Sequence, residues 1–78
     1  MTNREKYIAA FTDALAVGAE ETEELAYGQS AAWDSVGHMR LIANLEDAFG
    51  IMMDMDDIID FSSFEKGKDI LRKYDVAF

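Results

Sequence analysis

The sequence contains no cysteine and no proline among its 78 residues. Without cysteine the chain forms no disulfide, thiolate metal site or cysteine nucleophile, so any thiol that its function requires must come from outside. No apolar stretch approaches the length that crosses a membrane. The first residues include Arg4, Glu5 and Lys6 and do not resemble a secretory signal. We therefore expect a cytoplasmic protein.

Basic residues are scarce as well. Seven of them stand against sixteen acids, which gives a net charge of −9. Residues 7–65 hold thirteen acids and a single base, Arg40, whereas four bases gather between residues 66 and 73. Such a charge distribution repels nucleic acid and anionic lipid and favours partners with basic patches. We expect neither nucleic-acid nor membrane binding; the alternative is that the acidity serves only solubility.

Residues 1–78 are expected to form one domain, because a chain of this length closes a single hydrophobic core. Apolar residues at helical spacing predict a first helix over about residues 3–17 that ends near Gly18. The most regular pattern covers residues 35–49 and precedes Gly50, a typical stop. Between these helices we expect a long loop pinned by a few buried side chains. The candidate pins are Leu25, Tyr27 and Trp33.

The last third of the sequence predicts two more helices. A short one begins at Asp54 or Asp56, and a longer one is capped by Ser62 or Ser63. Gly67 lies inside the longer helix and costs about 1 kcal/mol relative to alanine. No segment alternates apolar and polar residues as a half-buried strand does. The expected fold class is therefore all-α, a small four-helix bundle of three longer helices and one short third helix.

Asp34 and Ser35 lie where a polar loop meets the most regular helix. Taken alone, this pair is a typical N-cap that supplies an oxygen to the free amide groups of the first turn. The same position also suits a phosphate, because a hydroxyl is exposed there and a helix N-terminus favours an anion. The two interpretations are compatible.

Residues 33–50, WDSVGHMRLIANLEDAFG, resemble the modification site of the acyl carrier protein family, in which an Asp-Ser-Leu-type motif opens the second helix. Further residues match the types that the family has at these positions: Leu41, Ile42, Leu45, Glu46, Asp47 and Phe49. The sequence departs from the family at Val36, where leucine is commonest, at Gly37 inside the first turn, and at Arg40, where an acid is frequent.

The resemblance implies that Ser35 receives the cofactor 4′-phosphopantetheine from coenzyme A. A phosphopantetheinyl transferase would supply the base and the magnesium ion for this step. The thiol of the arm would hold acyl groups as thioesters, in keeping with the absence of cysteine. The chain is thus expected to be an acyl carrier for fatty acid or polyketide-type biosynthesis, and a substrate of other proteins rather than an enzyme.

The resemblance and the charge pattern together indicate a docking surface on the second and third helices. An apolar strip rimmed by acids suits brief association with a basic patch on an acyl ligase, acyltransferase or synthase. The expected docking residues are Asp34, Val36, Met39, Ala43, Glu46, Asp47, Asp54, Asp56, Asp57 and Asp60. A solvated charged face is the alternative. We expect a monomer whose loosely packed interior shelters the acyl chain, as the resemblance implies.

Two other functions remain open. The chain would otherwise carry aminoacyl groups or an amino acid destined for the cell envelope. Peptidyl carriers, however, usually have Gly-Gly-(His/Asp) before the serine, where this sequence has Ala31-Ala32-Trp33-Asp34. It would otherwise be an unmodified helical adaptor that binds a basic protein through its acidic face.

No metal site is expected. Asp54, Asp56 and Glu65 have the spacing of a calcium-binding loop, but isoleucines occupy two of its required positions. The single histidine, His38, lacks partners for a metal site or a catalytic triad, so we expect it to face solvent or a partner.

Overall fold

The computed structural model of the chain describes residues 1–29 and 31–78. Ser30, part of the expected loop, lies outside the described residues. Within the described ranges the chain is mostly helical and has no strand, in agreement with the all-α fold class. The elements are α1 (Asn3–Leu15), the 3₁₀-helix η1 (Ala19–Glu24), α2 (Ser35–Phe49), α3 (Met55–Asp60) and α4 (Phe64–Arg72). None of the helices in this part of the chain has the length and apolarity to cross a membrane.

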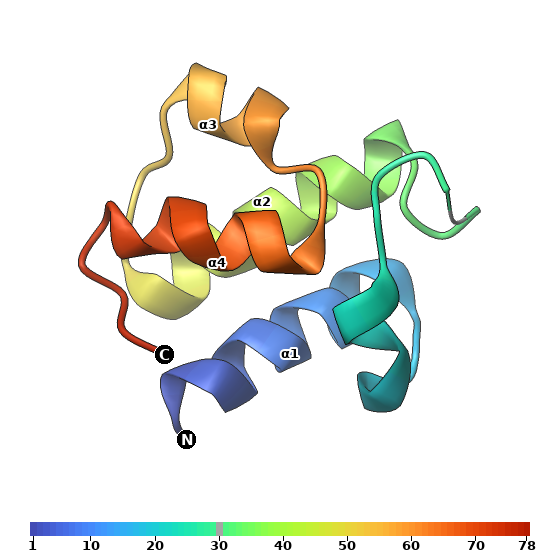
Figure 1. Cartoon of the computed structure of the whole chain (residues 1–78), viewed down its shortest axis with the longest axis horizontal. Helices are drawn as coiled ribbons and strands as arrows, with labels where there is room; N and C mark the ends of the chain where they lie inside the picture. The colour runs from blue at the N-terminus through green and yellow to red at the C-terminus, as the bar shows by residue number, and fades with distance from the viewer. Residues whose placement is uncertain (30) are drawn as a thin grey trace.

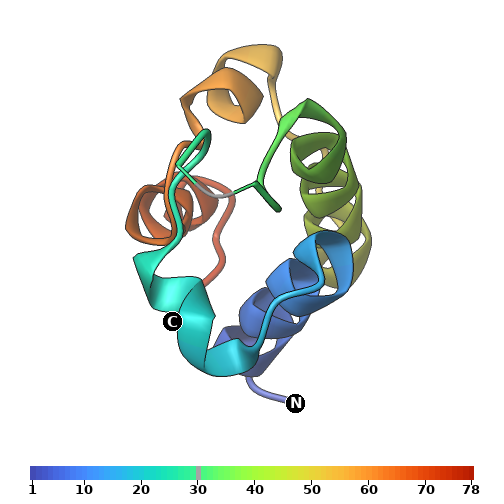
Figure 2. The same ribbon diagram turned by 90° about the vertical axis from the view of Figure 1, so that its right-hand side faces the viewer.

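The arrangement places α3 apart from the other helices. The first two long helices, α1 and α2, pack side by side, and α4 lies across from them with η1 against it (Figure 1). Figure 2 shows α3 at one end of the molecule, above the space between α2 and α4.

The first helix begins as predicted and ends earlier. Thr2 and Glu5 form a capping box, in which each side chain accepts a hydrogen bond from the other's amide. The helix was predicted to cover about residues 3–17, but it ends at Leu15, because Ala16 already has a left-handed backbone with φ 55°. This conformation costs conformational free energy for any residue other than glycine. Leu15 is buried in the core and Val17 packs against it, and these apolar contacts on either side of Ala16 offset that cost.

The segment between α1 and α2 was expected to lack structure, but it contains η1. The side chain buried from this element is Thr22, whose hydroxyl donates to the carbonyl of Ala19 at 2.9 Å. A short element that buries a threonine shows no apolar periodicity, which is why the sequence pattern did not reveal it.

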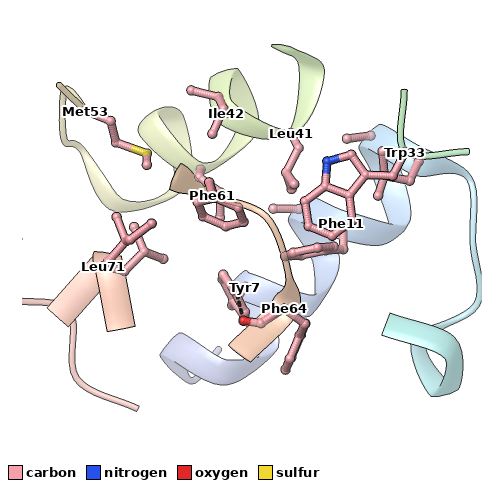
Figure 3. Close-up of a cluster of buried hydrophobic side chains, with 14 of the residues drawn as sticks. Tyr7, Phe11, Trp33, Leu41, Ile42, Met53, Phe61, Phe64 and Leu71 are labelled. Carbon is pink, nitrogen blue, oxygen red and sulfur yellow. Dashed lines mark hydrogen bonds between the residues drawn. The ribbon is translucent and has the colours of Figure 1, made fainter. Parts of the chain in front are cut away.

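The core is built around aromatic rings (Figure 3). Tyr7 of α1 packs against Phe11 and Phe64 with ring centroids 5.0 and 4.8 Å away. Phe11 also meets Trp33 edge to face at 5.4 Å. Of the three expected loop pins, Trp33 is fully buried and Leu25 packs partly buried against the core. The prediction that Tyr27 is a buried side chain was wrong, because Tyr27 is 44% exposed.

Gly67 in α4 is required by this packing. A Cβ atom at this position would lie 2.2 Å from both the Tyr7 Oη and the Phe61 Cζ atoms, far inside van der Waals contact. The Tyr7 hydroxyl in turn donates to the carbonyl oxygen of Phe64 at 2.6 Å. Ser63, not Ser62, caps the helix by accepting from the Lys66 amide. Glycine at position 67 lowers the helix propensity of α4, but its lack of a side chain makes room for two aromatic rings.

Candidate functional site

Ser35 is the first residue of α2, and its side chain is exposed. The cap is supplied by Asp34, whose Oδ1 atom accepts a hydrogen bond from the Gly37 amide at 2.8 Å. The amides of Ser35 and Val36 have no acceptor within the helix, as in the first turn of any α-helix. The Ser35 hydroxyl is therefore not used for capping, and it lies at the positive end of the longest helix in the described chain.

Gly37, one of the departures from the carrier pattern, allows the chain to pack closely at this site. A Cβ atom there would lie 2.6 Å from the carbonyl oxygen of Ala32 and 2.8 Å from Leu15 Cδ2. Glycine therefore lets the end of the loop and the end of α1 approach the first turn of α2.

Tyr27 was missed as a site residue. Its hydroxyl oxygen lies 3.2 Å from the Ser35 Oγ atom, within hydrogen-bond distance. The loop is fixed here by the Tyr27 amide, which donates to the carbonyl of Ser62 at 2.8 Å. The contact joins residues on either side of an irregular turn, so no spacing rule would have found it.

His38 was expected to face solvent or a partner, but it is partly buried and bonded on both sides. The Trp33 Nε1–H group donates to His38 Nδ1 at 3.0 Å. Since Nδ1 is the acceptor, the neutral ring carries its hydrogen on Nε2, which donates to the carbonyl of Ile58 at 2.8 Å. This carbonyl belongs to the last turn of α3, where helix geometry provides no partner. His38 thus links the loop, α2 and α3.

A pocket of about 360 Å³ opens beside Ser35, between α2 and α3. Its lining residues come from the loop, from both helices and from the segment after α3: Tyr27, Ser35, His38, Met39, Ile58, Ile59, Phe61 and Ser62. Most of the lining is apolar. Leu41 and Leu45 of α2, which are fully buried in the core, are not among the residues that line this pocket. The room next to Ser35 lies at the surface.

Apolar side chains are exposed around this pocket. Val36 and Met39 of α2 are 60% and 59% exposed, and Ala43 is exposed one turn further along. On α3, Met55 and Ile59 are 74% and 71% exposed, and neither was among the predicted docking residues. Five of the predicted docking acids are exposed: Asp34, Asp47, Asp54, Asp56 and Asp60. Asp34, Asp54, Asp56 and Asp60 adjoin Ser35, Met55 and Ile59 in the sequence, whereas Asp47 lines a separate hollow next to α1. The surface therefore combines apolar side chains with carboxylates.

Besides Asp34, which caps α2, two of the predicted docking acids have partners within the chain. Asp57 is only 6% exposed, so its prediction as a docking residue was wrong. Its carboxylate accepts from Lys73 Nζ and from the Tyr74 hydroxyl, and these two hydrogen bonds, that from Lys73 first, lower its pKa. Glu46 is partly buried and accepts from the Met53 amide at 2.9 Å. Glu46 thus holds the segment before α3, and Asp57 attaches α3 itself to the residues that follow α4.

The site thus consists of an exposed serine hydroxyl at a helix N-terminus, a phenol beside it and a mostly apolar pocket between α2 and α3. The positions of these groups follow from contacts between the loop, α2 and α3. Comparisons with models of protein families, with curated proteins and with solved structures give no match.

Proposed function

We propose that this protein is an acyl carrier protein, in which Ser35 carries a 4′-phosphopantetheine arm. The observation that supports the proposal most is that the exposed Ser35 hydroxyl opens directly onto the apolar pocket between α2 and α3. The long helices α1, α2 and α4 with the short α3 at one end are compatible with the four-helix bundle that we propose for a single carrier domain.

The residues present fit this group. A phosphate on Ser35 would lie at the helix N-terminus, where the amides of Ser35 and Val36 and the helix dipole favour negative charge. The adjoining pocket offers the hydroxyls of Tyr27 and Ser62 to a polar arm, and the side chains of Met39, Ile58 and others to an aliphatic chain. When attached, the arm supplies the thiol that the sequence lacks, and acyl groups are carried on it as thioesters.

We propose that a partner supplies the base for the modification of Ser35, because the described neighbours of Ser35 have other contacts. Asp34 Oδ1 accepts the Gly37 amide, and both ring nitrogens of His38 are engaged by other groups. Ser35 Oγ would form its bond to phosphorus while the phosphoanhydride bond of coenzyme A breaks and the nucleotide part leaves. The hydroxyl proton would go to a base of the phosphopantetheinyl transferase. In this proposal the protein is a substrate of its partners and not an enzyme.

The exposed acids at the start of α2 and along α3 would guide those partners. Asp34, Asp54, Asp56 and Asp60 favour acyl ligases, acyltransferases or synthases with basic patches, by electrostatic attraction that speeds encounter and weakens with salt. We propose that the carrier acts as a cytoplasmic monomer in fatty acid or polyketide-type biosynthesis.

The apolar lining favours acyl over aminoacyl cargo. An aminoacyl group brings an ammonium ion, which is costly to place among Met39, Ile58 and Phe61 without a partner. The loaded form should therefore be a better substrate for ligases of aliphatic acids than for amino-acid ligases. Faster loading with amino acids would reverse this assignment.

Incubation with coenzyme A and a transferase of broad specificity tests the proposal. Intact-protein mass spectrometry should show the gain of one phosphopantetheine group. The gain should vanish in Ser35→Ala and persist in Ser62→Ala, a matched control that removes the other serine hydroxyl lining the pocket. If the wild-type protein gains no mass, or if Ser35→Ala still does, the assignment is wrong and an unmodified acidic adaptor becomes the better explanation.

A further inference from the structure

Tyr27 is held firmly although its side chain is 44% exposed. Its amide donates to the Ser62 carbonyl at 2.8 Å, and the neighbouring Ala26 forms an isolated antiparallel bridge with Ser63. On the other side, the amide of Gly28 donates to the carbonyl of Trp33 at 3.2 Å. The backbone around Tyr27 is therefore attached both to the segment before α4 and to the segment before α2.

The ring of Tyr27 is also positioned by its neighbours. It meets His38 edge to face with centroids 5.2 Å apart, and it meets Trp33 in the same way at 6.4 Å. These two residues are themselves joined by the Trp33–His38 hydrogen bond. An aromatic ring fixed on this side has its hydroxyl directed to one place, 3.2 Å from Ser35 Oγ.

The three tyrosines differ in what their hydroxyls contact. The Tyr7 hydroxyl donates to a buried carbonyl and the Tyr74 hydroxyl donates to Asp57, so both support the fold. The Tyr27 hydroxyl instead meets the candidate modification site, and both residues line the same pocket. A folding role therefore explains the ring of Tyr27 but not the position of its hydroxyl.

We propose that Tyr27 is a phosphate-contacting residue, whose phenol donates a hydrogen bond to the phosphodiester attached at Ser35 and thereby directs the arm toward the pocket. The inference rests on the proposed function. In the unmodified protein either hydroxyl can be the donor. Once Ser35 Oγ is an ester oxygen it has no hydrogen, so Tyr27 becomes the donor. A hydrogen bond to a charged oxygen is stronger than one to a neutral hydroxyl.

The direct test compares the wild-type protein with Tyr27→Phe, both loaded with the arm. Phenylalanine keeps the ring contacts with Trp33 and His38 and removes only the hydroxyl. The ³¹P chemical shift of the wild-type phosphodiester should differ between the native protein and the urea-unfolded protein. In native Tyr27→Phe, the ³¹P chemical shift should lie close to that of the unfolded protein. Relaxation of ¹⁵N-labelled amides in the arm should show that the arm is more mobile.

Ser62→Ala is the matched control, because it removes a pocket hydroxyl for which the structure shows no contact with Ser35. Its ³¹P shift and arm mobility should equal those of the wild type, and near-ultraviolet circular dichroism should show that both variants keep the native aromatic packing. Identical ³¹P shifts and arm mobility in Tyr27→Phe and the wild type would overturn the inference about Tyr27. Failure of the wild type to accept the arm would instead overturn the proposed function.

Discussion

The aromatic core and the α2–α3 face are stabilised in different ways. In the core, Tyr7, Phe11 and Phe64 are fully buried and pack against one another in edge-to-face or tilted arrangements. On the face, Met39 and Ile59 remain more than half exposed beside a pocket. The difference indicates that stability and binding space are separated, because the core can hold α2 in place while α3 adapts to what lies against it.

Polar contacts attach α3 to the rest of the molecule. His38 binds the carbonyl of Ile58 in the last turn of α3. Asp57 binds the side chains of Lys73 and Tyr74, and the Tyr74 hydroxyl accepts from the Asp54 amide at 2.9 Å. A helix of six residues is not stable by itself. Loss of one of these contacts should therefore loosen α3 before it unfolds the core.

The largest difference between the two regions should come from truncating apolar side chains. Phe11→Ala should reduce the free energy of unfolding by about 3–5 kcal/mol, because it leaves a cavity among packed rings. Ile59→Ala should change it by less than about 0.5 kcal/mol, because the side chain is 71% exposed. Urea denaturation followed by circular dichroism measures both. Equal losses of unfolding free energy in the two variants would show that the core and the α2–α3 face contribute equally to stability.

A smaller and more local effect is expected from His38→Ala. It leaves the Trp33 indole N–H and the Ile58 carbonyl without their partner, at a cost of about 2 kcal/mol. Amide hydrogen exchange should quicken in α3 more than in α1. Met39→Ala, an exposed neighbour on the same helix, serves as the control and should leave exchange in α3 nearly unchanged. Uniform quickening in all helices would contradict a local role.

Tyr7→Phe should cost about 1 kcal/mol, the net contribution of one buried hydrogen bond to the Phe64 carbonyl. Burial, followed by the charges of Glu65 and Asp69, raises the pKa of Tyr7 well above its ordinary value of 10.0. Its neutral form therefore contributes stability below pH 10.0 that is lost as the pH rises further. Alkaline absorbance titration should show one phenol that ionises only with unfolding, and Tyr7→Phe should lack that phase. A normal titration of all three tyrosines in the folded protein would show that the Tyr7 phenol is not protected by burial.

The smallest pH-dependent effect is expected from Asp57→Asn, which weakens the contacts with Lys73 and Tyr74. Because these hydrogen bonds lower the pKa of Asp57 below its ordinary value of 3.8, its stabilising effect is complete above that pH and disappears as the pH falls through the lower, folded value. The stability difference between wild type and variant should thus shrink in acid below about pH 3.8. A difference that grows on acidification would have the wrong sign.

The sequence predicted elements whose boundaries depend on local chemistry. Both ends of α2 were found because Asp34 caps its first turn and Gly50 has the left-handed backbone, φ 63°, of a typical stop. The end of α1 was missed because tertiary packing holds Ala16 in a conformation that alanine disfavours. Gly67 was interpreted as a cost, since the rings that require it come from two other segments.

The site was predicted only in part for the same reason. The sequence indicated Ser35 from the helix pattern and the family resemblance of residues 33–50, and it indicated the acids from the charge along the second and third predicted helices. Tyr27 lies beside Ser35 because of backbone contacts with the segment before α4, which no local pattern contains. Asp57 resembles its acidic neighbours in the sequence, and only the position of Lys73, sixteen residues later, shows that it is paired.

The most direct test of the central claim is the mass of the protein purified from its own cells, with the modified residue located by peptide fragmentation. We predict a mass above that of the unmodified sequence by one phosphopantetheine group, with or without an acyl chain, located on Ser35. Protein that is always unmodified, or that carries the group on another residue, would contradict the account.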